Sequence, residues 1–172
     1  MPDQPALAGP PSAPVPASVR LEFLPSTLLI PVVRQFVSEF YECLLHNPDA
    51  VSRVALATHE LLENAAKYSS TGGASLAIAV DAREGVDAVT ISIRNPTSEE
   101  HVGRVTGLID AMNQYEDPFE FYQLQMRKTA RLKEGSGLGL VRVCVEGEMK
   151  LRWSMESGAL EIFAETEIRR TV

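Results

Sequence analysis

The sequence predicts a two-layer α/β sandwich, in which helices cover one face of a mixed, mostly antiparallel sheet. Short segments that alternate between apolar and polar residues are typical of strands, and they occur in adjacent pairs that a tight turn can join. Longer segments with apolar residues at helical spacing separate these pairs, so we expect a layer of helices over the sheet. Residues 19–172 are enough for one domain with a hydrophobic core.

The chain opens with a proline-rich segment before its first strand. Residues 1–18 hold six prolines and almost no large apolar side chain, which predicts a disordered tail or linker. Residues 19–24 alternate well enough for a short strand. Ser26 or Thr27 is then expected to cap a helix that runs to about Leu45.

A second helix has the clearest start signal in the chain. Asn47 is a favourable N-cap, Pro48 suits the first helical position, and Asp49 complements the helix dipole. We expect this helix to run to about Tyr68. Its apolar stripe consists of Val51, Val54, Ala55, Leu61, Leu62 and Ala65.

The second half of the chain contains two hairpins with helices between them. Residues 69–73 break the chain before the first hairpin, and residues 81–85 join its two strands. Residues 96–134 form a long insertion with two helices, the second over about 118–131. A glycine-rich segment then opens a last helix that runs to about Glu148. The four strands are expected at residues 75–80, 89–93, 150–155 and 160–166.

Composition and charge exclude several classes of function. The formal net charge of −7 argues against general nucleic-acid or membrane binding, which favours a basic surface. No apolar run approaches the roughly 20 residues of a membrane span, and the start of the chain does not resemble a signal peptide. We therefore expect a cytoplasmic protein. Cys43 and Cys144 have no metal-binding spacing and are expected to be buried, and His46, His59 and His101 form no zinc pattern.

One polar face of the second helix is a candidate site. The segment reads Glu60-Leu-Leu-Glu-Asn64-Ala-Ala-Lys67-Tyr68, and its spacings of four and three place Glu60, Asn64 and Lys67 on one face. A carboxylate and a carboxamide one turn apart can address a water, a hydroxyl or a magnesium ion. The structural alternative is a solvated face with an ion pair between Glu63 and Lys67.

The second candidate site is the segment Gly135-Ser-Gly137-Leu138-Gly139-Leu140. Backbone N–H groups at a glycine-rich helix start can cradle phosphates. The G-x-G-x-G spacing and the polar residues before it do not match a dinucleotide-binding fingerprint, and no Gly-Lys-Ser/Thr follows as in a P-loop. The structural alternative is a flexible hinge before a helix.

In this order, with strands between them, the two segments resemble the N-box and the G2-box of the GHKL ATP-binding superfamily. The resemblance implies the Bergerat ATP-binding fold, with residues 96–134 as a helical lid. It implies that Asn64 holds Mg²⁺, that Glu60 is the general base and that Lys67 lies near the phosphates of ATP. It assigns phosphate binding to the glycine segment, through Gly135, Gly137, Leu138 and Gly139.

The chain departs from this family between the two boxes. GHKL proteins usually carry Asp-x-Gly-x-Gly after the second hairpin strand, where the aspartate accepts a hydrogen bond from the adenine amine. The matching segment here is Asn95-Pro-Thr-Ser-Glu, so Asn95 is the expected base-contacting residue and neither glycine is present. This departure, the two-helix insertion and the glycine segment together resemble the SiaB-type subgroup of small partner-switching regulators.

The resemblance leaves three functions open. The first is a Mg²⁺-dependent protein serine/threonine kinase of a bacterial partner switch, which phosphorylates a STAS-domain, anti-anti-sigma-like partner. The second is a catalytically degenerate module of the same fold that sequesters a STAS-domain protein or a sigma factor. The third is the catalytic half of a two-component kinase. A homodimer is also compatible with the family. The basic residues before the glycine segment are a solvated face, or one of them closes on the γ-phosphate; they are Arg127, Lys128, Arg131 and Lys133.

Overall fold

The computed structural model describes residues 17–170, except for residues 25, 46, 71 and 130–136. Residues 1–16 of the predicted tail lie outside this part of the chain, and the first strand begins at Ala17, two residues before the expected start of the domain. The elements in chain order are β1 (Ala17–Phe23), α1 (Ile30–Leu44), α2 (Pro48–Tyr68), β2 (Ala74–Arg83), β3 (Val86–Pro96), α3 (Glu99–Met112), α4 (Pro118–Thr129), α5 (Leu138–Val145), β4 (Lys150–Glu156) and β5 (Ala159–Arg169).

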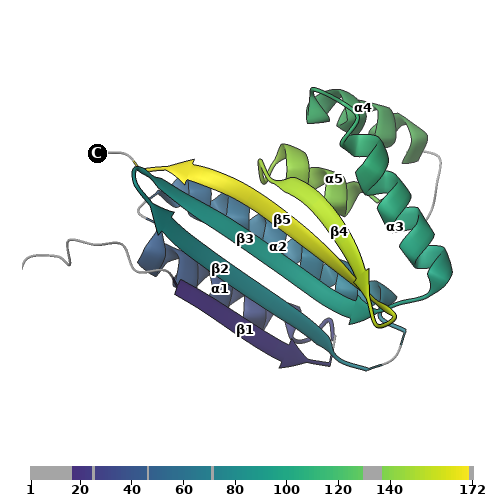
Figure 1. Cartoon of the computed structure of the whole chain (residues 1–172), viewed down its shortest axis with the longest axis horizontal. Helices are drawn as coiled ribbons and strands as arrows, with labels where there is room; N and C mark the ends of the chain where they lie inside the picture. Colours follow the sequence, from purple (N-terminus) through teal and green to yellow (C-terminus); the bar gives the residue numbers. More distant parts are fainter. Residues whose placement is uncertain (1–16, 25, 46, 71, 130–136, 171–172) are drawn as a thin grey trace, which may run out of the picture.

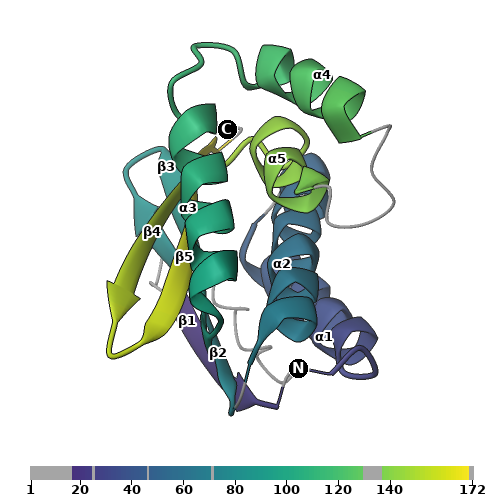
Figure 2. The same ribbon diagram turned by 90° about the vertical axis from the view of Figure 1, so that its right-hand side faces the viewer.

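The five strands form one open sheet in the order β1-β2-β3-β5-β4 (Figure 1). Each pair of neighbours is antiparallel, so the sheet is antiparallel throughout the described residues and not mixed. The helices lie on one side of it, and α2 packs on β3 and β5 (Figure 2). The predicted α/β class and the predicted order of elements are confirmed. Within the insertion, α3 packs on β4 and α4 packs on α5.

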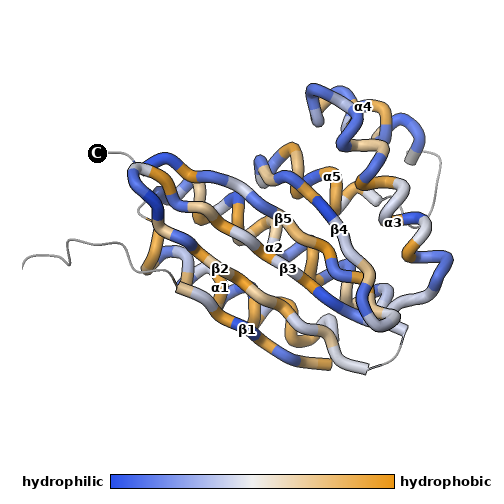
Figure 3. Tube along the Cα trace, in the orientation of Figure 1, coloured by the Kyte–Doolittle hydropathy of each residue, from blue (hydrophilic) through white to orange (hydrophobic). Residues whose placement is uncertain are grey.

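The core lies between the helix-facing side of the sheet and α2. Side chains at alternate positions of β2 and β3, such as Leu76, Ile78, Ile91 and Ile93, are almost completely buried. Every residue of the predicted apolar stripe of α2 is buried as well. Hydrophobic positions accordingly recur along these strands and helices (Figure 3). Burial of this apolar surface is the main force that holds α2 against the sheet. It also determines which face of α2 is left to line a site.

The two predicted helix starts have different outcomes. Asn47 caps α2 as expected, because its Oδ1 accepts a hydrogen bond from the N–H of Ala50 at 3.1 Å, and α2 ends at Tyr68 as expected. The predicted cap of α1 is wrong. Ser26 instead accepts a hydrogen bond from the N–H of Leu28 at 3.3 Å, inside a turn, and α1 begins only at Ile30. The turn that Ser26 stabilises therefore moves the first residue of the helix to a later position than expected.

Several other boundaries differ from the sequence expectations. The hairpin β2–β3 is longer than predicted, since residues 81–83 continue the strand and only Glu84 and Gly85 remain as the turn. The last helix is shorter than predicted and ends at Val145. Gly147 follows, and a Cβ there would lie only 2.4 Å from the carbonyl oxygen of Val143, so the chain turns where only glycine fits.

The two cysteines differ in burial. Cys144 is buried as expected, whereas Cys43 is exposed, so the prediction for Cys43 is wrong. Within the described residues, no helix is both long and apolar enough to cross a membrane. In the same part of the chain, no group of three His, Cys, Asp or Glu side chains is arranged to hold a metal ion.

Candidate functional site

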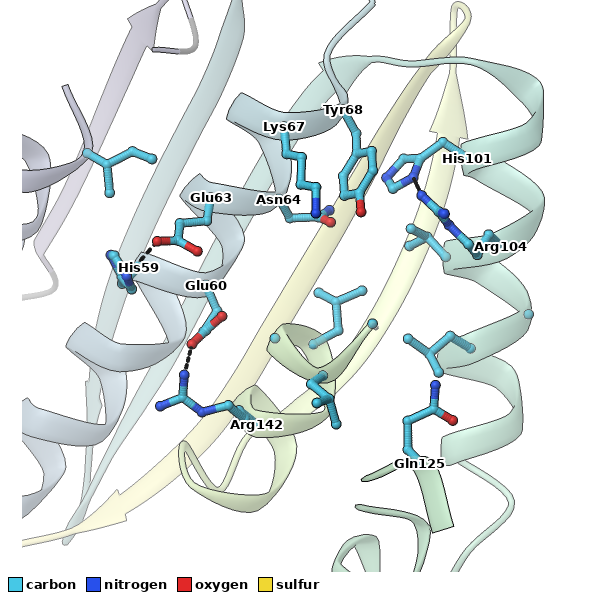
Figure 4. Close-up of a pocket in the computed structure, with 18 of the residues that line it drawn as sticks. His59, Glu60, Glu63, Asn64, Lys67, Tyr68, His101, Arg104, Gln125 and Arg142 are labelled. Atoms are coloured by element: carbon cyan, nitrogen blue, oxygen red, sulfur yellow. Dashed lines mark hydrogen bonds and ion pairs between the residues drawn. The ribbon is translucent and has the colours of Figure 1, made fainter. Parts of the chain in front are cut away.

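A cavity of about 1070 Å³ lies between α2, α3, the start of α5 and the start of α1 (Figure 4). Six residues that the sequence assigned to the site line it, namely Glu60, Asn64, Lys67, Gly137, Leu138 and Gly139. Gly135 lies outside the described residues. Asn95 is not among the lining residues; it is buried on β3, and its side-chain amide donates to the carbonyl oxygen of Pro96 at 3.3 Å. The structure thus brings the two predicted motifs together and separates Asn95 from them.

The polar face of α2 is only partly solvated, because Glu63 and Lys67 are exposed whereas Glu60 is buried. Glu60 is only 8% exposed, although it lies away from the apolar stripe. Glu63 forms its ion pair with Nε2 of His59 at 3.0 Å, and not with Lys67. The ammonium of Lys67 lies 5.3 Å from the ring centroid of Tyr68. Glu63 and Lys67 therefore do not form the expected helical pair, and the burial of Glu60 is what departs from a solvated face.

Glu60 forms an ion pair with Arg142 of α5. Nη1 of Arg142 donates to Oε1 of Glu60, and the same guanidinium donates from Nε and Nη2 to the two oxygens of Glu146 at 2.8 and 3.0 Å. The Glu146 contact is a bidentate pair between neighbouring turns of α5. Sequence reasoning missed Arg142 because 82 positions separate it from Glu60. Only the i,i+4 spacing of Arg142 and Glu146 was visible as a local signal.

The electrostatics of this cluster follow from burial and from the guanidinium. Burial raises the pKa of Glu60 above its usual range, and the nearby Arg142 opposes this rise. The hydrogen bonds from Arg142 lower the pKa of Glu146, which is exposed. The pKa of Arg142 is raised, so its side chain stays charged. The cavity thus contains a buried carboxylate that titrates closer to neutral pH than an ordinary glutamate.

The glycine segment contacts Glu60 directly. Gly137 is the N-cap of α5 with φ of +65°, a conformation that favours glycine. A Cβ at Gly139 would lie 2.6 Å from Oε2 of Glu60, so only a residue without a side chain lets the carboxylate approach the helix here. The positive end of the α5 dipole faces the same region and favours negative charge. The two motifs therefore form one site and not two neighbouring ones.

An aromatic cluster closes the other end of the cavity. The rings of Tyr68 and His101 are stacked, with centroids 3.8 Å apart and planes inclined by 18°. Nη2 of Arg104 lies 3.0 Å from Nδ1 of His101, and its guanidinium lies 4.9 Å from the centre of the Tyr68 ring. Burial, assisted by the charge of Arg104, lowers the pKa of His101 to about 4. The imidazole is therefore neutral at neutral pH, with Nδ1 as acceptor. No local sequence pattern indicates this contact, because it joins α2 to α3.

The lining of the cavity has a surplus of positive charge. Among the described residues, four basic side chains face it against two carboxylates, in a chain whose formal net charge is −7. The four are Lys67, Arg104, Lys128 and Arg142, and the two are Glu60 and Glu63. In the predicted basic cluster before the glycine segment, Lys128 lines the cavity, Arg127 is exposed, and Arg131 and Lys133 lie outside the described residues. An anionic ligand fits this charge distribution better than a cationic one.

Comparison with known proteins supports the fold. No protein-family model and no curated protein sequence matches the chain. A chain in the crystal structure of the SiaB–SiaC complex from Pseudomonas aeruginosa is similar, with a TM-score of 0.65 and 17% sequence identity. The match covers 87% of this chain and 89% of that chain. The two chains share a fold. At this level of identity the likeness extends to the arrangement of helices and strands, over nearly the whole length of both chains.

Proposed function

We propose that the protein is an ATP-binding regulator of a bacterial partner-switching system, with the GHKL type of site, and that it is a Mg²⁺-dependent protein serine/threonine kinase. One observation carries the proposal. The cavity brings Glu60, Asn64 and Lys67 of α2 against Gly137 and Gly139 at the start of α5, although the two motifs are far apart in the sequence.

The triphosphate of ATP suits the cationic part of this cavity. Lys67 and Lys128 supply positive charge from two helices, and the positive end of the α5 dipole adds to it. Gly137 is the N-cap of α5 and lines the cavity, so backbone N–H groups of the first turn, which have no partner within the helix, can face a phosphate there. Anions commonly bind at the start of a helix, so phosphate binding by these lysines and the start of α5 requires no further residue.

Asn64 suits a magnesium ion that the triphosphate shares. Mg²⁺ takes oxygen ligands, dehydrates reluctantly and is usually held by one or two protein groups together with phosphate oxygens. The side-chain carbonyl of Asn64, which lines the cavity one turn after Glu60, is such a group. When bound, the ion neutralises charge on the phosphates during transfer.

Glu60 suits the role of general base. In the proposed reaction a serine or threonine hydroxyl of the partner attacks the γ-phosphorus of ATP, the bond from this phosphorus to the β–γ bridging oxygen breaks, and ADP leaves. The hydroxyl proton passes to the carboxylate of Glu60. Burial already raises the pKa of Glu60, which makes its ionised form a stronger base than an exposed glutamate.

A protein partner is supported by the similar solved structure, which is a complex of two different proteins, SiaB and SiaC. We further propose that this partner is a STAS-domain protein, since STAS domains are the substrates of the kinases that the sequence resembles. The test is transfer of labelled phosphate from ATP to a partner isolated by co-purification. Glu60→Gln should lower transfer by about 10²–10⁴-fold, the usual contribution of a general base. Transfer by Glu60→Gln at the wild-type rate would contradict this role.

The position of Asn95 favours a second candidate, a module that binds its partner without phosphorylating it. Asn95 is the residue at the place of the adenine-binding aspartate, and it does not line the cavity. Such a module would sequester a STAS-domain protein or a sigma factor. Tight partner binding by the wild-type protein without phosphate transfer, with ATP and Mg²⁺ present, would support this candidate over the kinase.

A further inference from the structure

We infer that Arg142 is a positioning residue for Glu60, which keeps this carboxylate ionised and directed toward α5 in the resting site. The inference rests on the proposed role of Glu60 as a base, and it adds the group that regulates this base. It concerns a residue outside both sequence motifs. Arg142 follows the glycine segment on the same helix, so it ties the state of Glu60 to the position of α5.

The guanidinium of Arg142 bridges two carboxylates in different surroundings. The side chain of Glu60 is 8% exposed, whereas those of Arg142 and Glu146 are 37% and 39% exposed. Water screens the contact with Glu146, so that contact adds little energy and chiefly fixes the orientation of the guanidinium. The contact with Glu60 is screened less, because one of its partners is buried. Arg142 therefore acts on both carboxylates, and it is the main charge that opposes the effect of burial on Glu60.

The charged groups that face Glu60 divide into two sets. Burial, Glu63 on α2 and Glu146 at the C-cap of α5 favour its protonated form. Arg142 on α5 and His59 on α2 favour its ionised form, and Arg142 has the larger influence of the two. Removal of the Arg142 charge leaves mainly groups that favour protonation. A protonated Glu60 cannot accept a proton, so the loss of Arg142 would remove the base without touching its side chain.

The geometry of α5 gives this pair a regulatory consequence. Gly139 and Arg142 lie on the same short helix, and both contact Glu60. A ligand that binds at the start of α5 acts on the glycine contact and on the ion pair through one rigid element.

The test is a pH titration of the glutamate side-chain carboxyl signals by carbon-13 NMR, on the full chain without nucleotide. The Glu60 signal is assigned by its absence in Glu60→Gln. The variants are Arg142→Gln, which removes the charge, and Arg142→Lys, which keeps it. Arg53→Gln is the matched control, because Arg53 on α2 also pairs with a glutamate that follows α5, namely Glu148, but it does not line the cavity.

We expect the pKa of Glu60 to rise in Arg142→Gln, to return toward the wild-type value in Arg142→Lys, and to stay at that value in Arg53→Gln. An unchanged pKa in Arg142→Gln would overturn the inference. If Arg142→Gln does not fold, Glu146→Gln is the second variant, in which loss of a negative charge should lower the pKa of Glu60. A pKa of Glu60 that does not fall in Glu146→Gln would then overturn the inference.

This titration separates the inference from the proposed function, because it needs neither ATP nor a partner. The phosphate-transfer assay supplies the functional readout. In Arg142→Gln, the rate should fall at neutral pH by up to the ~10²–10⁴-fold contribution of a base, and it should recover as the pH rises and Glu60 ionises. A rate that stays low at every pH would indicate a purely structural role and overturn the inference. A wild-type protein that transfers no phosphate would contradict the kinase proposal and leave the titration result standing.

Discussion

Nη1 of Arg142 on α5 donates a hydrogen bond to Oε1 of Glu60 on α2, across 82 positions of sequence. This contact joins two segments that local patterns treat as separate motifs. It places a buried carboxylate, a fixed cation and a glycine-rich helix start within one cavity. The charge state of Glu60 therefore depends on residues from several parts of the cavity. Ionisation of Glu60 should lower the free energy of unfolding and raise the activity.

We predict that Glu60→Gln makes the protein relatively more stable as the pH rises. The pKa of Glu60 is raised in the folded protein, chiefly by burial, so the unfolded chain loses this proton first. The stability of the wild type therefore falls as the pH rises from the ordinary glutamate range through the raised value. Glutamine does not titrate and keeps an oxygen for Arg142. Urea unfolding of both proteins between pH 4 and 8 measures the difference, and a difference that is constant over this range would exclude the effect.

Gly139→Ala should impair the site and leave the fold almost intact. A Cβ at this position would lie 2.6 Å from Oε2 of Glu60, which is the far end of a flexible side chain and can turn away. We expect phosphate transfer to drop by as much as the ~10²–10⁴-fold contribution of a general base, with a change in unfolding free energy below about 1 kcal/mol.

The control for this substitution is Gly103→Ala on α3. Nothing lies within 4 Å of a Cβ at Gly103, and alanine is the better helix former by up to ~1 kcal/mol. Gly103→Ala should raise stability and preserve transfer. Wild-type transfer by Gly139→Ala, with both variants folded, would show that the close contact between Gly139 and Glu60 has no role in the reaction.

The stacked pair Tyr68–His101 predicts a loss of stability in acid. The pKa of His101 is lowered to about 4, so protonation of the unfolded chain begins first as the pH falls below about 6.5. The wild type should lose up to about 3 kcal/mol between pH 6.5 and 4 through this one group. His101→Phe keeps a ring against Tyr68 and removes the titration. Its unfolding free energy should decrease less steeply over the same interval, and an equal slope in the two proteins would refute the assignment.

The sequence alone predicted those features of the fold that depend on interactions between neighbouring residues. The start of α2 followed from the Asn47 cap, and the hairpins followed from alternation of apolar and polar residues. The start of α1 was not predicted, because the Ser26 side chain serves a turn and not a helix. The end of the last helix depends on the close packing of Gly147 against the carbonyl oxygen of Val143, which the local pattern does not reveal.

Only some of the residues that line the site could be predicted from the sequence. Helical spacing placed Glu60, Asn64 and Lys67 on one face, but it said nothing of what packs over that face. Arg142 and the stack of Tyr68 on His101 come from contacts between different helices, which no local pattern encodes. The second hairpin strand was expected to end at residue 93, whereas β3 ends at Pro96 and includes Asn95. Whether the side chain of Asn95 reaches the cavity depends on the packing of β3 against the helices.

The most direct test of the central claim is calorimetric titration of the full-length protein with ATP in the presence of Mg²⁺. The wild type should bind Mg²⁺-ATP, and ligand at a hundredfold above Kd should stabilise it by about 2.7 kcal/mol. Asn64→Ala should lose this binding, because Asn64 is the proposed magnesium ligand, while Glu63→Gln should retain it, because Glu63 is paired with His59. Titrations without heat, together with identical melting of the wild type and Asn64→Ala with and without Mg²⁺-ATP, would contradict the account.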